Sequence, residues 1–333
     1  MSGTTKKKNM RTSLLRILPF AALMFTSSGV SFSQPYPAKP IRLIVPFAPS
    51  GGTDLLGRTI AQKLSEAWAQ PVVVDNRSGG SGNIGTDMVA KSPPDGYTLL
   101  MGYVGNLAIN PFLFKKLPYD PVKDFAPVTL AATAPNVLVA HPSVAAGNVK
   151  ELVVLLRASP SKFNYASAGN GTVGHMVAEL FKTATSTSIL HIPYKGNGAA
   201  ITDTLAGNVQ LMFSAPAAVL QHIKAAKLKG LAIASARRAS GLEDVPTFAE
   251  AGYAAIEASA WYGILVAGGT PPVIVTKLNR ELVRIIQLQD VKDRFANLGY
   301  EAATSSPEEF SRLINTDLAK WQKVVKASGA RVD

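Results

Sequence analysis

Short apolar runs rich in β-branched residues alternate along the chain with helical stretches. Apolar runs of this kind, bounded by glycine, proline and polar clusters, are typical of strands. We expect strands at residues 41–45, 72–74, 97–101, 136–140, 190–192, 210–213, 228–234 and 262–267. We expect helices in the segments between them, at residues 54–68, 84–91, 150–159, 173–183, 198–206 and 217–226.

This alternation predicts an α/β fold. Near-continuous apolar strands separated by helices indicate parallel sheets that are covered on both faces. No internal repeat or low-complexity linker divides the chain, so we expect two lobes joined by crossing strands, with a ligand cleft inside. The first lobe would comprise residues 36–135 and 236–333, and the second residues 136–235. The C-terminal part of the chain predicts three successive helices, at residues 273–288, 291–298 and 307–327.

Three apolar runs end in glycine-rich turns, and each turn opens a predicted helix. The turns lie within residues 48–54, 75–85 and 164–175. The first N–H groups of a helix have no intrahelical partner and carry partial positive charge. Glycine lets another molecule approach that backbone closely, and open α/β sheets bind ligands at the carboxyl ends of their strands. The pattern therefore predicts a site that holds an anion.

The composition is that of an exported globular protein. Apolar residues make up 47% of the 333 residues, which indicates a packed core. Residues 1–33 contain five basic residues and no acidic one, and the apolar stretch at 17–25 is too short to span a bilayer. Because the small residues Ser31 and Ser33 end this segment, we expect a signal peptide over 1–33, cleaved near Ser33, and an exported protein. A buried N-terminal helix is the alternative interpretation.

The charge and cysteine content narrow the choice of partners. The formal net charge is +12, and without residues 1–33 the chain keeps 29 basic against 22 acidic residues, or about +7. This surplus is spread along the chain, so it favours anions mildly and does not predict nucleic-acid binding. The chain has no cysteine, which excludes disulfides, a lipoprotein anchor and any cysteine-based metal site or nucleophile.

Motifs for catalysis or nucleotide binding are weak or missing. Residues 52–59 approach the phosphate-binding loop pattern with arginine in place of lysine, and residues 80–85 and 169–174 fit GxGxxG, a pattern that is weak alone. Export also removes the protein from cytoplasmic ATP and NAD. The four histidines lack zinc-site spacing, and no GxSxG serine is present. We therefore expect no catalytic residue, no metal and no cofactor.

Several polar residues of the turns allow two interpretations. Asp54 either caps the first predicted helix or contacts a ligand and shapes its loop. Ser167 and Thr172 either cap the later helix or offer hydroxyls to a carboxylate, and these roles can coexist. His175 stands beside the same turn, as a ligand contact or as a structural residue.

A series of short motifs runs in order over nearly the whole chain beyond residue 35. They include Tyr36-Pro37-x-Lys39-Pro40, Val45-Pro46-Phe47 with Gly51-Gly52-x-Asp54, Asp95-Gly96-Tyr97-Thr98-Leu99, Ser167-Ala168-Gly169-x-Gly171-Thr172, Pro193-Tyr194-Lys195-Gly196 and Trp261-Tyr262-Gly263. With these motifs the chain resembles the periplasmic substrate-binding receptors of tripartite tricarboxylate transporters, known as Bug-type receptors. The resemblance implies a type II periplasmic-binding-protein fold, in which two α/β lobes close on a small organic anion.

The resemblance also implies where the ligand binds. A ligand carboxylate would be held by the loop before the first helix and by the Ser-Ala-Gly turn of the other lobe. These regions correspond here to Phe47, Ala48, Ser50, Gly51, Gly52 and Asp54, and to Ser167, Ala168, Gly169, Gly171, Thr172 and His175. Neighbouring turns add the candidates Asn83, Tyr103, Asn106 and Tyr194.

The expected function is therefore capture of a small organic acid, without catalysis, and its delivery to transmembrane permease subunits. The ligand could be a di- or tricarboxylate, an aromatic acid or an amino acid. Many relatives carry aspartate where this chain has Ser214, which makes an amino acid the less expected ligand. A receptor that signals to a two-component system, or a secreted hydrolase or isomerase using the same cleft, are the alternatives.

Overall fold

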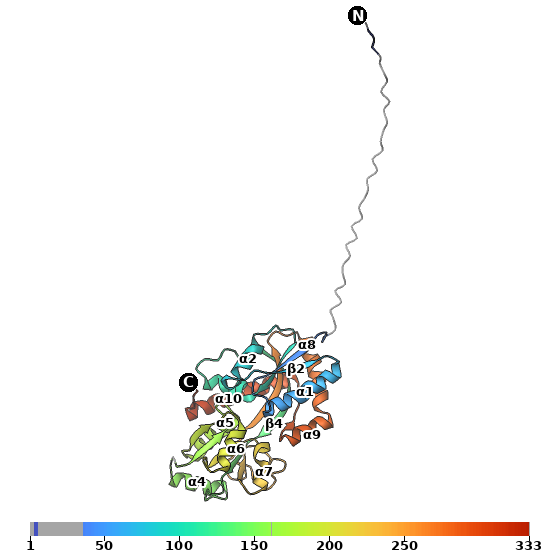
Figure 1. Ribbon diagram of the computed structural model, residues 1–333. Coiled ribbons are helices and arrows are strands. Elements are labelled where there is room, and N and C mark those ends of the chain that lie inside the picture. Colours follow the sequence, from blue (N-terminus) through green and yellow to red (C-terminus); the bar gives the residue numbers. More distant parts are fainter. Residues whose placement is uncertain (1–2, 6–35, 161, 333) are drawn as a thin grey trace. The chain divides into compact units, whose positions relative to one another are not determined.

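The computed structural model describes residues 3–5, 36–160 and 162–332 (Figure 1). Apart from residues 3–5, the predicted signal peptide and its cleavage point near Ser33 lie outside the described residues. The chain divides into two units, Met1–Pro35 and Tyr36–Asp333. All strands and helices described below belong to the second unit.

A six-stranded sheet forms the first lobe, with the strand order β11-β4-β10-β3-β1-β2. Its strands are β1 (Ile41–Val45), β2 (Val72–Asn76), β3 (Thr98–Tyr103), β4 (Phe125–Pro135), β10 (Ser259–Ala267) and β11 (Glu301–Ala302). The helices of this lobe are α1 (Gly52–Trp68), α2 (Asn83–Ala90), α3 (Asn110–Leu113), α8 (Pro272–Ile286), α9 (Gln289–Asn297) and α10 (Pro307–Ser328). Two short helical turns, η1 (Gly80–Gly82) and η2 (Gly105–Ile109), precede α2 and α3.

A five-stranded sheet forms the second lobe, with the strand order β7-β6-β8-β5-β9. Its strands are β5 (Val137–Ala140), β6 (Asn164–Ser167), β7 (Leu190–Pro193), β8 (Leu211–Ser214) and β9 (Lys229–Ile233). The helices gathered around it in Figure 1 are α4 (Val149–Ala158), α5 (Val173–Thr185), α6 (Asn197–Leu205) and α7 (Pro216–Lys224). Buried apolar side chains from the sheets and their helices form the core of the protein.

The predicted strands and helices are present, but the prediction of wholly parallel sheets is wrong. Strand β1 is parallel to β2 and β3, and β6 is parallel to β7 and β8. In contrast, β10 runs antiparallel to β3 and β4, and β5 runs antiparallel to β8 and β9. The antiparallel strands are those next to the connections between the lobes. A strand that arrives from the other lobe enters its sheet from the opposite end, so both sheets are mixed.

The expected strands did not include β4, β6 or β11, although the third glycine-rich turn implied a strand end at β6. Strand β4 pairs with β10 along its length, although Pro127 and Pro135 lie within it. Proline removes a backbone donor and argues against a central strand, and the pairing of β4 with β10 shifts register between Ile264 and Leu265, where Pro127 lies opposite Leu265. Tertiary pairing thus overrides the local signal in β4.

The two lobes are joined by chain segments that lie side by side. Asn136 is the single residue between β4 and β5. Its carbonyl oxygen accepts a hydrogen bond from the N–H of Ala234 (2.7 Å), just after β9, and the carbonyl of Ala234 accepts one from the N–H of Ala258 (3.0 Å), just before β10. The predicted crossing of strands between the lobes is therefore found. The second sheet is built from strands within residues 137–233.

The three C-terminal helices are also present as predicted. Helix α10 begins with a capping box between Ser306 and Glu309, which satisfies free N–H groups of its first turn. It packs on β4 and η2, and Trp261 on β10 donates its indole N–H to Asp317 Oδ2 (2.6 Å). These contacts attach the C-terminal segment to the first lobe.

Candidate functional site

The loop between β1 and α1 is held in place by the carboxylate of Asp54. This carboxylate accepts hydrogen bonds from the N–H of Ser50 (2.9 Å), the Nε of Arg58 (2.9 Å) and the amide of Asn76 (2.9 Å). Burial alone would raise the pKa of Asp54, but the hydrogen bonds from Arg58, Asn76 and Ser50 outweigh it and hold this pKa below its usual value. Asp54 therefore shapes the loop. It lies behind the loop and does not line the pocket described below.

The turn between β6 and α5 is held by neutral groups. Thr172 is the N-cap of α5, where its hydroxyl oxygen accepts the N–H of His175 (3.3 Å) and its O–H donates to the carbonyl of Gly169 (2.7 Å). The hydroxyl of Ser167 lies 3.2 Å from both the N–H and the carbonyl oxygen of Gly169. Both hydroxyls thus serve the turn itself.

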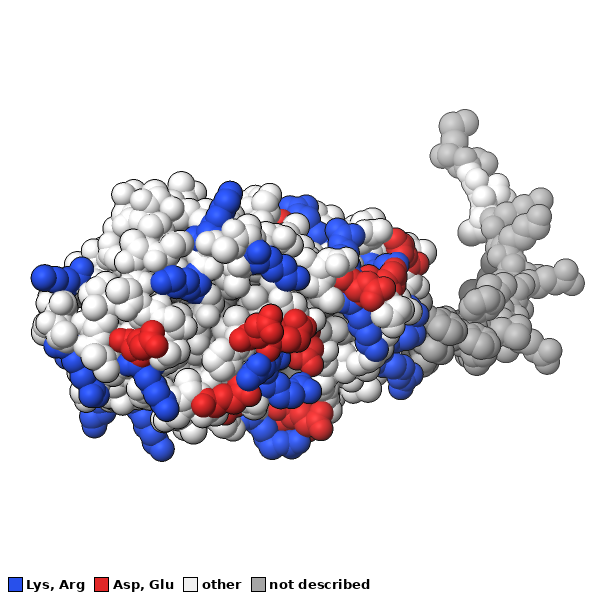
Figure 2. Space-filling view, turned by 90° about the horizontal axis from the view of Figure 1, so that it is seen from below, with Lys and Arg blue, Asp and Glu red and all other residues white. Residues whose placement is uncertain are grey.

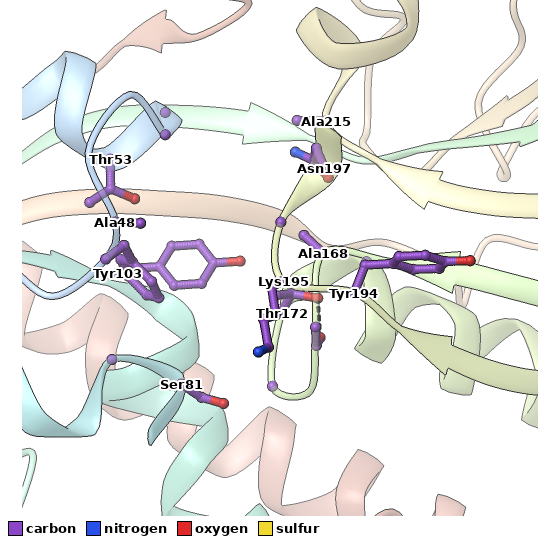
Figure 3. A pocket seen from close by; sticks show the side chains of 18 of the residues that line it. Ala48, Thr53, Ser81, Tyr103, Ala168, Thr172, Tyr194, Lys195, Asn197 and Ala215 are labelled. Atoms are coloured by element: carbon purple, nitrogen blue, oxygen red, sulfur yellow. Dashed lines mark hydrogen bonds between the residues drawn. The ribbon is translucent and has the colours of Figure 1, made fainter. Parts of the chain in front are cut away.

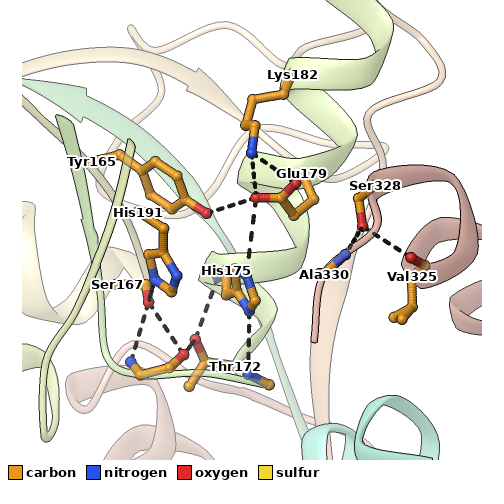
Figure 4. Close-up of polar contacts among 12 residues, drawn as sticks. Tyr165, Ser167, Thr172, His175, Glu179, Lys182, His191, Val325, Ser328 and Ala330 are labelled. Atoms are coloured by element: carbon orange, nitrogen blue, oxygen red, sulfur yellow. Dashed lines mark hydrogen bonds and ion pairs between the residues drawn. The ribbon is translucent and has the colours of Figure 1, made fainter. Parts of the chain in front are cut away.

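Two stacked histidines pack against this turn (Figure 4). The ring of His175 stacks on that of His191 with centroids 4.2 Å apart, and His191 stacks on Tyr165 at 4.6 Å. The Nδ1 of His175 accepts the N–H of Gly171 (3.3 Å), and the Nε2 of His191 lies 2.7 Å from the hydroxyl of Ser167. His175 therefore supports the turn through its bond to Gly171 and does not line the pocket.

Burial keeps both histidines neutral. Burial, with a smaller contribution from the charge of Lys182, lowers the pKa of His175 to about 4. Burial, together with the neighbouring His175 and Lys182, lowers that of His191 to about 3. A neutral His175 keeps a lone pair on Nδ1 for the N–H of Gly171. On the side of the stack away from the turn, the buried carboxylate of Glu179 accepts hydrogen bonds from Tyr165 (2.9 Å) and Lys182 (2.8 Å) (Figure 4). The turn thus packs against a layer of largely buried side chains that are linked by hydrogen bonds.

Tyr103 connects the two lobes at the pocket. Its hydroxyl oxygen accepts the N–H of Val173 (3.1 Å) in the first turn of α5, although Tyr103 itself belongs to β3 of the first lobe. Its ring stacks on Tyr262 with centroids 5.1 Å apart and meets Phe47 edge-on at 5.7 Å. These contacts bring the loop of the first lobe and the turn of the second lobe to opposite walls of one pocket.

Asn83 and Asn106 are buried behind these walls. Asn83 accepts hydrogen bonds from the amide of Asn110 (2.7 Å) and the hydroxyl of Tyr119 (2.9 Å). Asn106 accepts the N–H of Tyr103 (3.2 Å) and donates to the hydroxyl of Thr86. Neither residue lines the pocket, so both orient the loops that do.

The pocket has a volume of about 930 Å³ and is lined by both lobes. In Figure 3, Ala48, Thr53 and Tyr103 lie on one side of it, and Ala168, Lys195 and Asn197 on the other. Most of the predicted contact residues line it: Phe47, Ala48, Ser50, Gly51, Gly52, Tyr103, Ala168, Gly169, Gly171, Thr172 and Tyr194. Asp54, Asn83, Asn106, Ser167 and His175 lie outside the lining and hold it in place.

Other lining residues were not predicted. They include Ser81, Asn136, Lys195, Asn197, Ser214, Tyr262 and Tyr300. Asn197 and Ser214 follow the rule used for the other turns, because each lies at a junction between a strand of the second sheet and the next helix. Tyr300 carries no such signal, since it reaches the pocket from the loop between α9 and β11.

Five helices begin at the pocket. Their N-cap residues Gly51 (α1), Gly82 (α2), Thr172 (α5), Gly196 (α6) and Ala215 (α7) all line it. Only Thr172 makes a side-chain cap hydrogen bond, so the first turns of the other four helices keep N–H groups without a partner in their own helix. Helix N-termini carry partial positive charge and bind anions.

The charged residues of the pocket agree with the partial positive charge of these helix N-termini. Lys195 is the one charged residue among the lining residues that the structure describes, and none of them is acidic. On the face shown in Figure 2, by contrast, basic and acidic side chains lie close to one another. The positive potential of the pocket therefore comes from local backbone dipoles and Lys195, and it suits a small organic anion.

Comparison with known proteins identifies the family. The sequence model of the tripartite tricarboxylate transporter family receptor matches residues 56–330. The chain belongs to this family. It is 36% identical to BugT of Bordetella pertussis over 323 residues, which are 96% of this chain and 99% of BugT. The expected Bug-type family is thus confirmed.

Solved structures of relatives agree with the fold. Rpa4515 of R. palustris, solved with adipate, is 36% identical and has a TM-score of 0.82, with 88% of this chain and 98% of that chain covered. MatC from Rhodopseudomonas palustris, with bound malate, is 30% identical and has a TM-score of 0.79, with coverage of 87% and 100%. The two-lobe periplasmic-binding-protein fold is therefore confirmed. None of the described helices is long and apolar enough to cross a membrane.

Proposed function

We propose that this protein is exported to the periplasm, captures a small carboxylate-bearing organic anion between its lobes and delivers it to the permease of a tripartite tricarboxylate transporter. One observation carries the proposal: helix N-termini from both lobes meet at a pocket with no acidic residue among its described lining residues. The adipate and malate bound to the two relatives support a carboxylate as the ligand.

The ligand carboxylate would lie between the Phe47–Gly52 loop and the Ala168–Thr172 turn. Each loop offers backbone N–H groups from one lobe, so only a closed pair of lobes satisfies both oxygens. Hydrogen bonds to a charged group contribute roughly 1.5–3 kcal/mol each. Four or five of them, less the cost of ordering the ligand and the lobes, reach the ~8 kcal/mol of micromolar affinity. Ligand binding then shifts the protein toward the closed form, which a permease recognises.

The lining favours binding without turnover. No histidine, aspartate or glutamate is among the described lining residues, so no such side chain stands in the pocket as a general base for its serine and threonine hydroxyls. The histidine nearest to the glycine turn, His175, is buried beneath it and bonded to Gly171.

Isothermal titration calorimetry of refolded, ligand-stripped protein tests the capture step. Against a panel of di- and tricarboxylates, aromatic acids and amino acids, we expect at least one carboxylate with micromolar or tighter affinity. The absence of any such binder would contradict the proposal. Uptake of the tightest binder by cells that lack this protein then tests delivery: uptake should fall to background and return when the gene is restored.

A further inference from the structure

Asn110 lies at the contact between the two lobes. It is the first residue of α3 in the first lobe, and it is fully buried. A Cβ built on Gly171, in the turn of the second lobe, would lie 2.4 Å from Asn110 Oδ1. The same turn meets the first lobe at Gly105, where an added Cβ would be 2.7 Å from the carbonyl oxygen of Gly171. The two lobes therefore approach each other closely at Gly171.

The two ends of the Asn110 amide differ in their bonding. Its Nδ2 donates to the carbonyl of Ser81 (3.1 Å) and to Oδ1 of Asn83 (2.7 Å). Because a backbone carbonyl can only accept, the bond to Ser81 identifies this end of the amide as the nitrogen. The oxygen end faces Gly171, and it is buried without a hydrogen-bond partner among the described residues.

The unpaired oxygen destabilises the arrangement in which the lobes meet. Most buried polar atoms are hydrogen-bonded, and a buried acceptor without a partner loses the bonds that water would give it. Gly171 fills the space beside the oxygen so closely that an added Cβ would not fit. Its own N–H is directed elsewhere, to Nδ1 of His175 (3.3 Å). The contact thus excludes water from the oxygen without replacing the lost hydrogen bonds.

The place of this contact connects its cost to movement of the lobes. Gly171 lines the pocket and belongs to the second lobe, whereas the Asn110 amide is bonded to Ser81 and Asn83 of the first lobe. In the proposed function, a ligand enters when the Ala168–Thr172 turn and the first lobe separate. Such a separation takes Gly171 away from the Asn110 oxygen.

We propose that Asn110 opposes closure of the empty protein. In the open form water reaches its amide oxygen, and in the closed form Gly171 excludes that water. The closed form is then favoured only when hydrogen bonds to a ligand offset this cost. Asn110 acts through the contact between the lobes without touching the ligand, so it is a positioning residue. This inference rests on the proposed function and adds to it that a closed receptor is a loaded one.

The fraction of closed molecules without ligand tests the inference. The chain has no cysteine, so Val73→Cys on β2 and Val154→Cys on α4 allow one fluorophore to be placed at an exposed site of each lobe. Single-molecule energy transfer then gives the ratio of closed to open molecules, and a saturating carboxylate identifies the closed population. We expect the unmodified protein to be mainly open without ligand.

Variants of Asn110 should move this ratio in opposite directions. Asn110→Ala removes the unpaired oxygen, so we expect the ratio of closed to open molecules without ligand to rise about tenfold. Asn110→Asp has the same size but keeps an acceptor facing Gly171 and adds a negative charge, so its closure should require at least about tenfold more carboxylate. Asn110→Ser is the second variant if Asn110→Ala does not fold.

Asn279→Ala is the matched control for loss of an amide. The Asn279 amide donates to the carbonyls of Val128 (2.8 Å) and Ser305 (2.9 Å), within the first lobe and away from the pocket. This variant should lower the melting temperature and leave the ratio of closed to open molecules unchanged. A merely structural role of Asn110 would give that same result for Asn110→Ala.

Two results would overturn the inference while leaving carboxylate capture intact. The first is an unmodified protein that is mainly closed without ligand. The second is a ratio that stays the same or falls in both Asn110→Ala and Asn110→Ser. The calorimetry described above tests capture separately, and if no carboxylate binds, the proposed function and this inference both fail.

Discussion

The loop of the first lobe and the turn of the second lobe present similar backbone to the pocket but are held in opposite ways. Asp54 fixes the first with a charged network that includes the half-exposed Arg58. The second rests on the neutral, buried stack of His175 and His191. The Asp54 carboxylate can lie behind the first loop because hydrogen bonds from Ser50, Arg58 and Asn76 compensate its negative charge. Histidines suit the second turn because, once neutral, they can accept a backbone N–H without adding charge.

From this contrast we expect ligand binding to be more sensitive to a change in the backbone of the Ala168–Thr172 turn than of the Phe47–Gly52 loop. Gly171 has φ of 74°, and a Cβ there would lie 2.4 Å from the buried Oδ1 of Asn110. Gly171→Ala combines a left-handed backbone, which costs roughly 1–2 kcal/mol in a residue with a Cβ, with displacement of the turn. We expect ligand affinity to fall by about 100-fold or more, measured by calorimetry.

The control for Gly171→Ala is Gly252→Ala. Gly252 has φ of 96° with nothing within 4 Å of an added Cβ, and it does not line the pocket. This control should lose stability from backbone strain but keep its affinity. Equal affinity of the two variants would show that the turn plays no part in binding.

We expect replacement of the Asp54 carboxylate by an amide to weaken ligand binding. Asp54→Asn keeps the size of the side chain but turns one acceptor into a donor facing Ser50, Arg58 or Asn76. Since hydrogen bonds to charged groups contribute roughly 1.5–3 kcal/mol, and only part of this reaches the ligand, we expect affinity to fall about 10- to 30-fold. Glu281→Gln, which removes an acid from the pair with Arg284 on α8, is the control and should bind normally. Normal binding by Asp54→Asn would contradict the shaping role of Asp54.

We expect removal of the His175 acceptor to reduce ligand affinity less than removal of the Asp54 charge does. His175→Phe keeps an aromatic ring in the stack but removes the acceptor for the N–H of Gly171. A neutral hydrogen bond contributes about 0.5–1.5 kcal/mol, so we expect a loss of affinity of about 3- to 10-fold. His222→Phe, on α7 and outside the pocket lining, serves as the control. A larger loss than in Asp54→Asn would reverse the proposed ranking of the two supporting side chains, Asp54 and His175.

The same stack predicts how stability depends on pH. The folded protein keeps His175 and His191 neutral, with pKa values of about 4 and 3, whereas an unfolded histidine has a pKa of about 6.5. As the pH falls below about 6.5, the unfolded chain takes up protons that the folded protein does not, and the free energy of unfolding decreases. Tyr165, Glu179 and Lys182 are the ionisable groups that face the stack.

Urea denaturation between pH 7 and 4.5 measures this effect. We expect the free energy of unfolding to decrease by about 1–3 kcal/mol per pH unit near pH 5. The double variant His175→Phe/His191→Phe should have a clearly smaller slope, and His222→Phe should keep the original one. An unchanged slope in the double variant would contradict the neutral, buried state of the stack.

Much of the fold could be predicted from the sequence, because strand and helix patterns are local. The apolar run at 41–45 and the glycines of the following turn place the first strand, loop and helix correctly. The direction of β10 could not be predicted in this way. It depends on the path of the chain through the second lobe, and no local pattern in residues 259–267 records that path.

The candidate site likewise contains residues that the sequence predicts and residues that it does not. Glycine-rich junctions such as those at Gly51 and Gly171 are visible in the sequence because they combine a strand end with a helix start. Asn136 and Tyr300 are not, since only the folding of distant segments brings them to the pocket. The sequence indicates a structural role for His191 but not its partner, because the bond to Ser167 joins residues on neighbouring strands.

A crystal structure of the protein with its tightest-binding carboxylate tests the central claim most directly. We predict that the ligand carboxylate lies within hydrogen-bond distance, about 3 Å, of backbone N–H groups from both the Phe47–Gly52 loop and the Ala168–Thr172 turn. A carboxylate bound only by Lys195, or held by one lobe alone, would contradict the account.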